Sequence, residues 1–324
     1  MKPILVTGAS GFIGWHVARA LLVRGRKVRA LVRGTGRVRE LEVELAFGDL
    51  RDPDSLADAV KGCDTVYHVA GDYRLWAKHP DELYGSNVDG TRNMLAAALK
   101  EGVERFVYTS SVGCIGFVKG GLGDENTPAG LQDMTGHYKR SKFMAEKHAI
   151  QFASVGLPLV IVNPTAPVGG HDFKPTPTGR TILEFLKGRM PAYLDTGLNL
   201  VDVRDVAEGH LLACERGKKG ERYILGCENL ALKEVFDRLS GVSGLPAPER
   251  RIPYVVALAA AVADEVKSRI TGRAPRVPLE GVRMAKKKMF VTHEKAACEL
   301  GYRPGPVDQA LSRAVNWFRE NGYC

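Results

Sequence analysis

The sequence has few cysteines, and they do not cluster. Six cysteines are spread over 324 residues, with no C-x-x-C pair and no spacing typical of a zinc site. This excludes a disulfide scaffold and leaves no candidate metal site. Scattered free thiols are usual in a reducing compartment, so we expect a cytoplasmic protein without a bound metal.

Long apolar runs are also missing. The longest, residues 255–263, has nine residues, which is too short to cross a bilayer. Only Ile4, Leu5 and Val6 form an apolar run near the N-terminus, so we expect no signal peptide. The chain has no repeats or low-complexity tracts, and 44% of its residues are hydrophobic and 26% charged. These values are typical of a folded globular protein.

The charge is unbalanced, with 46 Lys and Arg against 37 Asp and Glu, a net +9. A solvated basic surface that aids solubility is the simplest interpretation. Attraction to phosphorylated ligands, or peripheral contact with an anionic membrane, is the alternative. No nucleic-acid-binding motif accompanies the charge, so we expect no nucleic-acid partner.

The first half of the chain alternates short apolar stretches with segments of helical periodicity. This alternation predicts βαβ units around a parallel sheet, and continuous apolar runs fit strands covered on both faces. The predicted strands are 3–7, 27–32, 42–47, 64–69, 105–109 and 157–162, and the helices are 12–24, one from about 53, 81–100 and 137–154.

After Pro164 the alternation stops. Residues 167–177 are rich in Pro, Gly and Thr, which indicates a loop. A helix at 203–215 and a strand at 222–225 predict that the chain rejoins the sheet around 198–227. We therefore expect a sheet domain at 1–166 and a smaller, mainly helical substrate-binding region at 167–324.

A glycine-rich turn separates the first predicted strand from the first helix. Glycines at this place give a tight turn and let the backbone approach a pyrophosphate, which the helix N-terminus then binds. The sequence thus predicts an α/β, Rossmann-type doubly wound parallel sheet that binds a dinucleotide. The residues of the turn expected to contact it are Gly8, Ser10, Gly11, Phe12, Ile13 and Gly14.

The second predicted strand ends at Arg33, with Arg37 and Arg39 behind it. A carboxylate near this place would bind the ribose of NAD, yet residues 15–39 contain no Asp or Glu. An arginine can pair with a 2′-phosphate, so the sequence favours NADP(H) over NAD(H). A solvated Arg33 without this role is the alternative.

Tyr138 and Lys142 stand four residues apart, on one face of a predicted helix. A lysine ammonium beside a tyrosine favours the phenolate and lets the tyrosine exchange a proton with a substrate. Ser110 and Ser111 follow the fifth predicted strand, at the sheet edge where ligands bind in such folds. We expect these residues to lie together.

Together with Gly48-Asp49-Leu50, His68-Val69-Ala70 and Asn87, these motifs resemble the extended short-chain dehydrogenase/reductase family over nearly the whole chain. The resemblance implies Tyr138 as the acid/base, Lys142 lowering its pKa and holding the ribose, Ser111 as the catalytic hydroxyl with Ser110 as the fallback, and Asn87 supporting the proton relay. It also implies cofactor contacts at Asp49, Leu50, Ala70, Gly71, Pro164 and Thr165.

A closer resemblance rests on residues 72–76, 136–142, 174–180, 188–193 and 286–290. These segments are similar to those of the hopanoid-associated sugar epimerases, a subgroup that also resembles dihydroflavonol 4-reductases. Cys114-Ile115-Gly116 departs from the Val-Tyr-Gly of many sugar epimerases, which puts a sugar-nucleotide contact in doubt.

The substrate contacts are less defined. Tyr73 and Trp76 are candidates for an aromatic wall and Arg180 for a phosphate contact, with a surface role as the alternative for each. We expect the apolar segment 254–266 to be part of the core; a membrane-surface anchor is the alternative.

The combined motifs predict an NAD(P)-dependent oxidoreductase, favoured as an NADPH-dependent reductase of a ketone or aldehyde in hopanoid lipid metabolism. An epimerase with a resident cofactor and a non-catalytic NADP(H)-sensing regulator are the alternatives. We expect a small-molecule or lipid-linked substrate, and the resemblance makes a homodimer the expected assembly.

Overall fold

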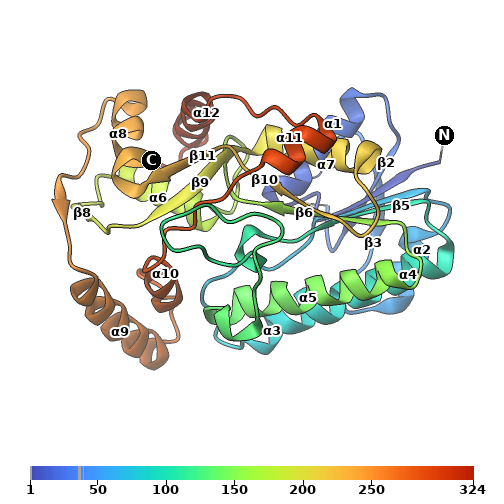
Figure 1. Cartoon of the computed structure of the whole chain (residues 1–324), viewed down its shortest axis with the longest axis horizontal. Coiled ribbons are helices and arrows are strands. Elements are labelled where there is room, and N and C mark those ends of the chain that lie inside the picture. The colour runs from blue at the N-terminus through green and yellow to red at the C-terminus, as the bar shows by residue number, and fades with distance from the viewer. Residues whose placement is uncertain (1, 36–37, 39) are drawn as a thin grey trace.

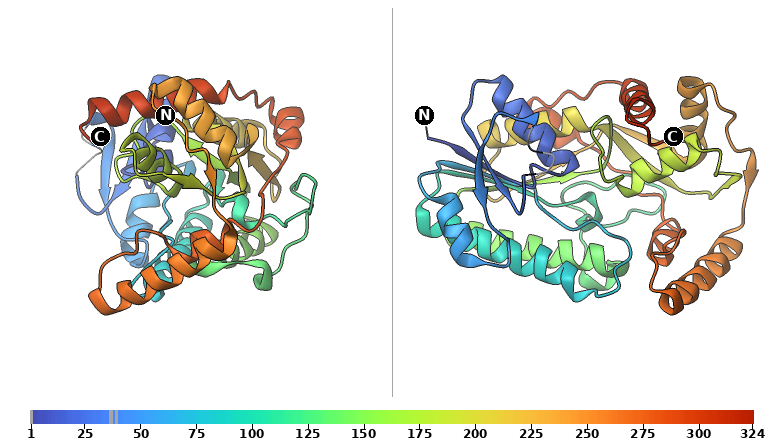
Figure 2. Two further views of the ribbon diagram at one scale, coloured as in Figure 1. Left: turned by 90° about the vertical axis from the view of Figure 1, so that its left-hand side faces the viewer. Right: turned by 180° about the vertical axis from the view of Figure 1, so that it is seen from behind.

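The computed structural model describes residues 2–35, 38 and 40–324. Arg37 and Arg39, the two arginines that follow Arg33 in the sequence, lie outside the described residues. The described chain forms a central sheet with helices on both faces and a second region at one end (Figures 1 and 2).

The central sheet has seven parallel strands in the order β10-β6-β5-β4-β1-β2-β3. The order reverses between β1 and β4, and in doubly wound sheets such a switch point is where ligands bind. The predicted fold class is therefore confirmed. The strands are β1 (Ile4–Thr7), β2 (Val28–Val32), β3 (Glu44–Phe47), β4 (Thr65–His68), β5 (Arg105–Thr109), β6 (Leu159–Pro164) and β10 (Arg222–Leu225).

Helices cover both faces of this sheet because its strands are apolar on both sides. On one face lie α2 (Pro53–Val60), α4 (Gly90–Glu101) and α5 (Gly136–Ser154), and on the other lie α1 (Phe12–Val23), α7 (Val203–Arg216) and α11 (Glu294–Leu300) (Figure 1). The long helix predicted at 81–100 is instead α3 (Asp81–Tyr84), a π-helical turn (Gly85–Asp89) and α4.

The second region has its own small sheet and core. The chain leaves the central sheet after β6 and returns with α7 and β10, which pairs with β6. The core of the region packs between the three-stranded sheet and the helices. Its elements are β7 (Ala166–Val168), β9 (Gly197–Asp202), β11 (Glu228–Ala231), α6 (Pro177–Leu186), α8 (Leu232–Ser243) and α12 (Val307–Glu320), beside a short pair, β8 (Ala192–Tyr193) and β12 (Arg250–Arg251).

Two further helices, α9 (Tyr254–Thr271) and α10 (Leu279–Met284), lie at the periphery (Figures 1 and 2). The expectation that segment 254–266 belongs to the core is wrong. Val255 is 73% exposed and Val262 45% exposed, while the small side chains Ala257 and Ala261 are buried. The helix is apolar on more than one face, so its sequence does not reveal which face is covered.

No helix within residues 2–35 or 40–324 has both the length and the apolar character needed to span a membrane.

Candidate active site

A cleft of about 830 Å³ lies at the carboxyl ends of the central strands. The turn after β1, the loop after β4, the serines after β5 and the loop after β6 all reach it. The predicted residues that line it are Gly8, Ser10, Gly11, Phe12, Ile13, Gly14, Arg33, Asp49, Leu50, Ala70, Gly71, Tyr73, Ser110, Ser111, Tyr138, Lys142, Pro164 and Thr165.

The glycine turn is built by close backbone contacts. A Cβ on Gly14 would lie 2.1 Å from the Gly8 carbonyl oxygen, and a Cβ on Gly8, whose φ is +74°, would lie 2.7 Å from the Ala70 nitrogen. The N-cap of α1, Gly11, makes no side-chain cap, and the first turn carries no acidic residue. The first N–H groups of α1 are therefore uncapped by side chains and fit the phosphates of the predicted dinucleotide.

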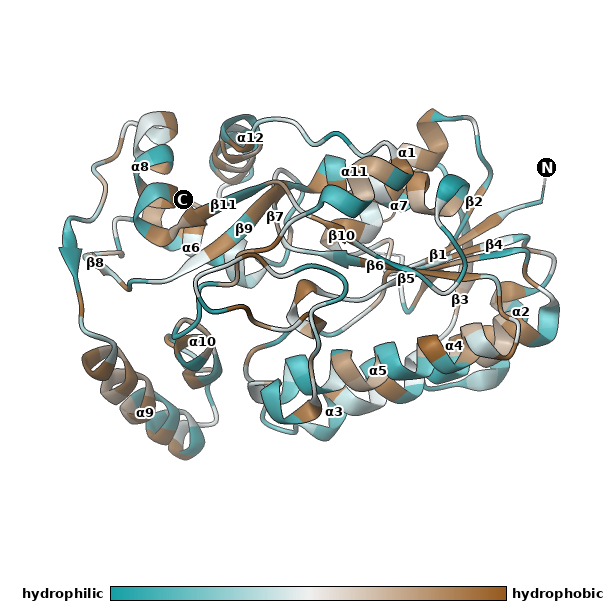
Figure 3. Cartoon of the chain, viewed as in Figure 1, coloured by the Kyte–Doolittle hydropathy of each residue, from teal (hydrophilic) through white to brown (hydrophobic). Residues whose placement is uncertain are grey.

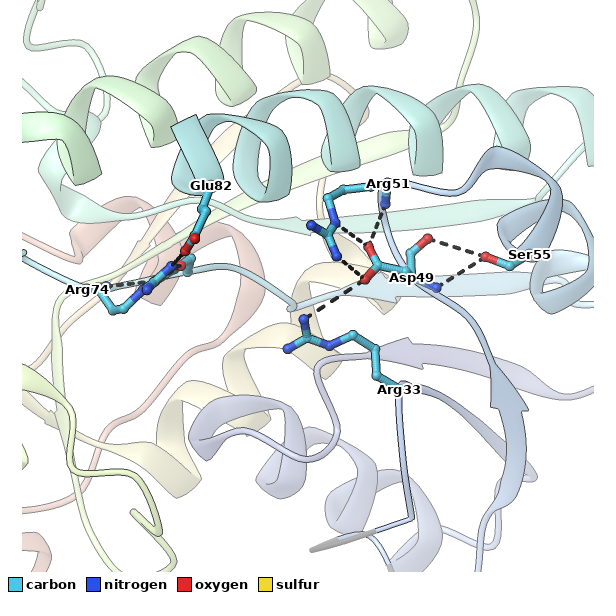
Figure 4. Close-up of polar contacts among 7 residues, drawn as sticks. Arg33, Asp49, Arg51, Ser55, Arg74 and Glu82 are labelled. Atoms are coloured by element: carbon cyan, nitrogen blue, oxygen red, sulfur yellow. Dashed lines mark hydrogen bonds and ion pairs between the residues drawn. The ribbon is translucent and has the colours of Figure 1, made fainter. Parts of the chain in front are cut away.

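Three charged side chains meet where β2 and β3 end (Figure 4). Arg51 donates from Nε and Nη2 to the two Asp49 carboxylate oxygens, at 2.9 and 2.8 Å, and Arg33 Nη1 lies 4.0 Å from the same carboxylate. The Arg51 hydrogen bond is the main reason that the pKa of Asp49 falls to about 2. Both guanidinium groups line the cleft, which makes this end of it basic.

Tyr138 and Ser111 both line the cleft. The Ser111 hydroxyl lowers the pKa of the Tyr138 phenol, but burial outweighs this effect and raises the pKa to about 12. Ser110 is buried, and its hydroxyl donates to Cys114 Sγ at 3.5 Å. The geometry therefore favours Ser111 over Ser110 as the hydroxyl that acts beside the tyrosine.

Lys142 is buried one helical turn after Tyr138 on α5. Its Nζ donates to the Thr109 carbonyl at 2.7 Å and lies 4.8 Å from the centre of the Tyr108 ring. Burial lowers the pKa of Lys142 to about 8. The effect that the resemblance implied for Lys142, a lowered pKa of Tyr138, stays a prediction.

Asn87 lies in the π-helical turn and is 2% exposed. Its Nδ2 donates to the Asp72 carbonyl and to the Ser141 hydroxyl, each at 2.9 Å, and its Oδ1 accepts from the Asp72 N–H at 2.7 Å. These bonds hold the loop after β4 against α5 and thereby position it beside Tyr138. Support of the proton relay by Asn87 stays a prediction.

The other end of the cleft is formed by the loop after β4 and the second region. Tyr73 donates its hydroxyl to the Lys174 carbonyl at 2.8 Å, so it connects the two sides. Arg74 is paired with Asp72 and Glu82, at 2.6 and 2.9 Å (Figure 4), and these bonds raise its pKa further.

Two predicted substrate contacts do not line this cleft. Trp76 lies beyond the part of the loop that reaches it, and Arg180 is exposed on α6, whose first residues Pro177 and Thr178 line the cleft instead. His68 is fully buried, bonded to Thr7 and Thr91, and has no place in the cleft.

Several lining residues were not singled out from the sequence. Arg51 follows the Gly48-Asp49-Leu50 motif directly, and its position there could have suggested it. Others come from separate segments that only the fold brings together, among them Glu82, Ser86, Phe173 and Met284. The described residues contain no group of three or more side chains placed to hold a metal ion.

Comparison with known proteins gives consistent findings. The sequence pattern of the NAD dependent epimerase/dehydratase family matches residues 4–226. The chain is 48% identical to a Synechocystis protein named "Putative dihydroflavonol 4-reductase", over 98% of this chain and 95% of that protein. It is 37% identical to sterol demethylase protein B of Methylococcus capsulatus, over 98% of each chain.

The fold is also similar to that of solved structures. A nucleoside-diphosphate-sugar epimerase from Pseudomonas aeruginosa superimposes with a TM-score of 0.82 at 30% identity, covering 99% of both chains. Relatives named as reductases and relatives named as epimerases therefore share this architecture.

Proposed function

The chain belongs to the NAD dependent epimerase/dehydratase family, part of the extended short-chain dehydrogenases/reductases, and from this membership we propose that it is an NADPH-dependent reductase of a ketone or aldehyde. Enzymes of this family share the nicotinamide-dependent chemistry; the direction of the reaction and the choice of cofactor are the proposal.

The observation that carries the proposal is the pair of arginines around Asp49. Arg33 and Arg51 enter the cleft from the ends of β2 and β3. Arg51 is held on Asp49 by two hydrogen bonds, while Arg33 is 77% exposed and reaches the carboxylate only at 4.0 Å. Two guanidinium groups suit the 2′-phosphate of NADPH, because they supply charge-assisted hydrogen bonds to phosphate oxygens.

The proposed proton chemistry uses three side chains. When bound, the nicotinamide cofactor supplies the hydride for the carbonyl carbon. Tyr138 gives its phenolic proton to the carbonyl oxygen, and the Ser111 hydroxyl holds that oxygen beside it. Lys142, tied to Thr109, holds the ribose and keeps positive charge near the phenol. Asn87 positions the loop after β4.

We place the substrate among polycyclic isoprenoid lipids, including those of hopanoid metabolism. The relative named for sterol demethylation and the resemblance to hopanoid-associated proteins support this class. We propose the cytoplasm as the location, because the scattered free cysteines suit a reducing compartment. We propose a homodimer as the assembly on the resemblance alone.

The second candidate is a sugar epimerase with a resident cofactor. The similarity to a solved nucleoside-diphosphate-sugar epimerase favours it. The two candidates differ in how the cofactor behaves, because a reductase exchanges it at each turnover and an epimerase regenerates it in place. A nucleotide sensor is less well supported, since Ser111, Tyr138 and Lys142 all lie in the cleft and a sensor has no need of them.

The test begins with protein purified without added nucleotide. It is denatured, and any released cofactor is identified by mass. An empty protein that binds NADPH more tightly than NADH is the expected result. Stoichiometric NAD⁺ or NADP⁺ retained through purification would favour the epimerase.

Two variants then test the arginines. Arg33→Ala and Arg51→Ala should each weaken NADPH binding by roughly tenfold or more, because each loses charge-assisted bonds worth about 1.5–3 kcal/mol. NADH binding should stay unchanged. Arg180→Ala is the matched control, since Arg180 is exposed and outside the cleft. Equal losses for NADH and NADPH would contradict the proposed role.

A further inference from the structure

One face of α9 is a continuous apolar surface. Val255, Val262, Val266 and Ile270 are 73%, 45%, 53% and 81% exposed, and the spacing of seven, four and four residues places them on one side of the helix. Ala259, between Val255 and Val262, is exposed on the same side. We call these five residues the apolar face of α9. Large exposed apolar surfaces of this kind mark interaction sites.

The opposite side of α9 holds the helix to the molecule through small side chains. Ala257, Ala261 and Ser268 are buried, and the first two pack with Val282 of α10. A core helix would bury its large residues and expose the small ones. Here the large residues are outside, so α9 has an apolar side that the rest of the described chain leaves uncovered. Figure 3 shows this helix as largely hydrophobic at the edge of the molecule.

The surroundings of this face are strongly basic. Residues 250–288 contain ten Lys and Arg against three Asp and Glu, an excess of seven in a chain whose net charge is +9. All ten basic residues are exposed. They are Arg250, Arg251, Lys267, Arg269, Arg273, Arg276, Arg283, Lys286, Lys287 and Lys288.

The three acidic residues of this segment are half-buried, and each one bonds to or pairs with another group of the protein. Asp264 accepts from the Val277 N–H at 2.9 Å, and Glu280 accepts from the His137 N–H at 2.9 Å. Glu265 is paired with Arg269 at 3.5 Å. Outside the segment, Asp195 pairs with Arg251 at 2.9 Å and with Lys288 at 2.8 Å. The basic residues still outnumber these acids, so the exposed field beside the apolar face is positive. Lys267 and Arg269, on α9 itself, flank that face.

We propose that the apolar face of α9 and its basic surroundings dock the protein on an anionic phospholipid bilayer. The apolar side chains enter the boundary between headgroups and acyl chains, and the lysines and arginines contact lipid phosphates. A second copy of this chain is a poorer occupant. In a two-fold dimer through this face, the same positively charged surface of each copy would face the other, and the like charges would repel.

Docking in this way brings the bilayer close to the substrate end of the cleft. α10 packs against α9, its Met284 lines the cleft, and its Glu280 binds the first turn of α5 beside Tyr138. The proposed docking surface does not depend on the proposed reductase activity, and the experiment below measures membrane binding without any assay of activity.

The experiment is sedimentation of the full-length protein with vesicles. One set contains two parts phosphatidylcholine and one part phosphatidylglycerol, and the other contains phosphatidylcholine alone. We expect binding to the anionic vesicles that weakens in high salt, since salt screens the exposed charges. Absence of binding to anionic vesicles at low salt would overturn the proposal.

Variants locate the surface. Val255→Asp and Ile270→Asp should each lower the partition coefficient by about tenfold, because each removes an apolar side chain from the interface and adds a negative charge. Val23→Asp is the matched control, because Val23 is 81% exposed and is the last residue of α1. The helix α1 lies far from α9 (Figure 1). The double variant Lys267→Gln/Arg269→Gln should bind the anionic vesicles more weakly, by about fivefold for each of the two positive charges removed.

Thermal unfolding of each variant checks that it is folded, since these side chains are exposed. Folded α9 variants that bind vesicles as well as the unaltered protein would contradict the assignment. A dimer seen by light scattering that Val255→Asp separates, in a protein that binds no vesicles, would assign the face to a second copy instead.

Discussion

At the scale of single residues, burial disfavours the charged form of both Tyr138 and Lys142. It raises the pKa of the phenol to about 12 and lowers the pKa of the ammonium to about 8. Reduction of a carbonyl needs the protonated phenol, so Tyr138 carries the proton that it is proposed to donate at neutral pH. Lys142 remains mostly charged below pH 8 and loses its charge as the pH rises through that value.

Replacing the phenol tests this directly. Tyr138→Phe should lower kcat by at least about a hundredfold, because it removes the general acid, while NADPH still binds. Steady-state kinetics and NADPH titration measure the two effects. Tyr84→Phe is the control, since the Tyr84 hydroxyl bonds only to His137 among the described side chains and lies outside the cleft. Turnover that survives in Tyr138→Phe would exclude the proposed mechanism.

At the scale of elements, the first strand and helix act as one unit. The Gly8 carbonyl accepts from the Gly11 N–H at 2.8 Å and leaves no space for a side chain on Gly14. The turn is thus compact enough for α1 to begin immediately behind β1, with its uncapped N–H groups at the cleft. The same contacts make the turn intolerant of even one added methyl group.

Two glycine variants measure this constraint. Gly14→Ala should abolish or severely weaken NADPH binding and lower the Tm, because the new Cβ would lie 2.1 Å from the Gly8 oxygen. Gly241→Ala is the matched control, since Gly241 is helical and has nothing within 4 Å of an added Cβ. It should raise the stability by up to about 1 kcal/mol. Gly14→Ala with ordinary NADPH affinity would show that the turn adapts.

At the scale of the whole molecule, three buried histidines connect separate parts of the structure. His16 bonds the Gly170 carbonyl at 3.0 Å and so joins α1 to the second region. His68 links β1 to α4, and His210 on α7 bonds Thr109 of β5 at 2.9 Å. Burial lowers their pKa values to about 3, 3 and 4, so all three are neutral in the folded protein.

This predicts acid lability. Below their ordinary pKa of 6.5 the histidines take up protons only when the chain unfolds, so the stability they support is present above pH 6.5 and falls as the pH decreases toward 4. Three such groups give a slope of about 4 kcal/mol per pH unit near pH 5. Urea unfolding across this range measures it.

A single replacement provides the control for the acid effect. His16→Gln keeps a donor for the Gly170 carbonyl and removes one titrating group. Its slope of stability against pH should be about one third smaller than that of the unaltered protein. An identical slope in both proteins would attribute the acid lability to other groups.

The sequence by itself determined the features that depend on short spacings. The glycine turn, the Tyr138 and Lys142 pair and the apolar strands follow from residues close together in the chain, because local geometry fixes where such residues point. The fold class and the family resemblance could be predicted for the same reason. The positions of Asp49 and Ser111 could be predicted because each residue follows the end of a strand, and the cleft lies at the carboxyl ends of the strands.

Only the tertiary structure decided what depends on distant segments. Arg51 turns back onto Asp49 beside Arg33, and Arg180 does not line the cleft, since packing between different elements sets which side chains meet. The sequence of α9 does not predict which face of the helix is covered. Apolar composition allows burial, but the surface that the rest of the chain offers decides whether burial takes place.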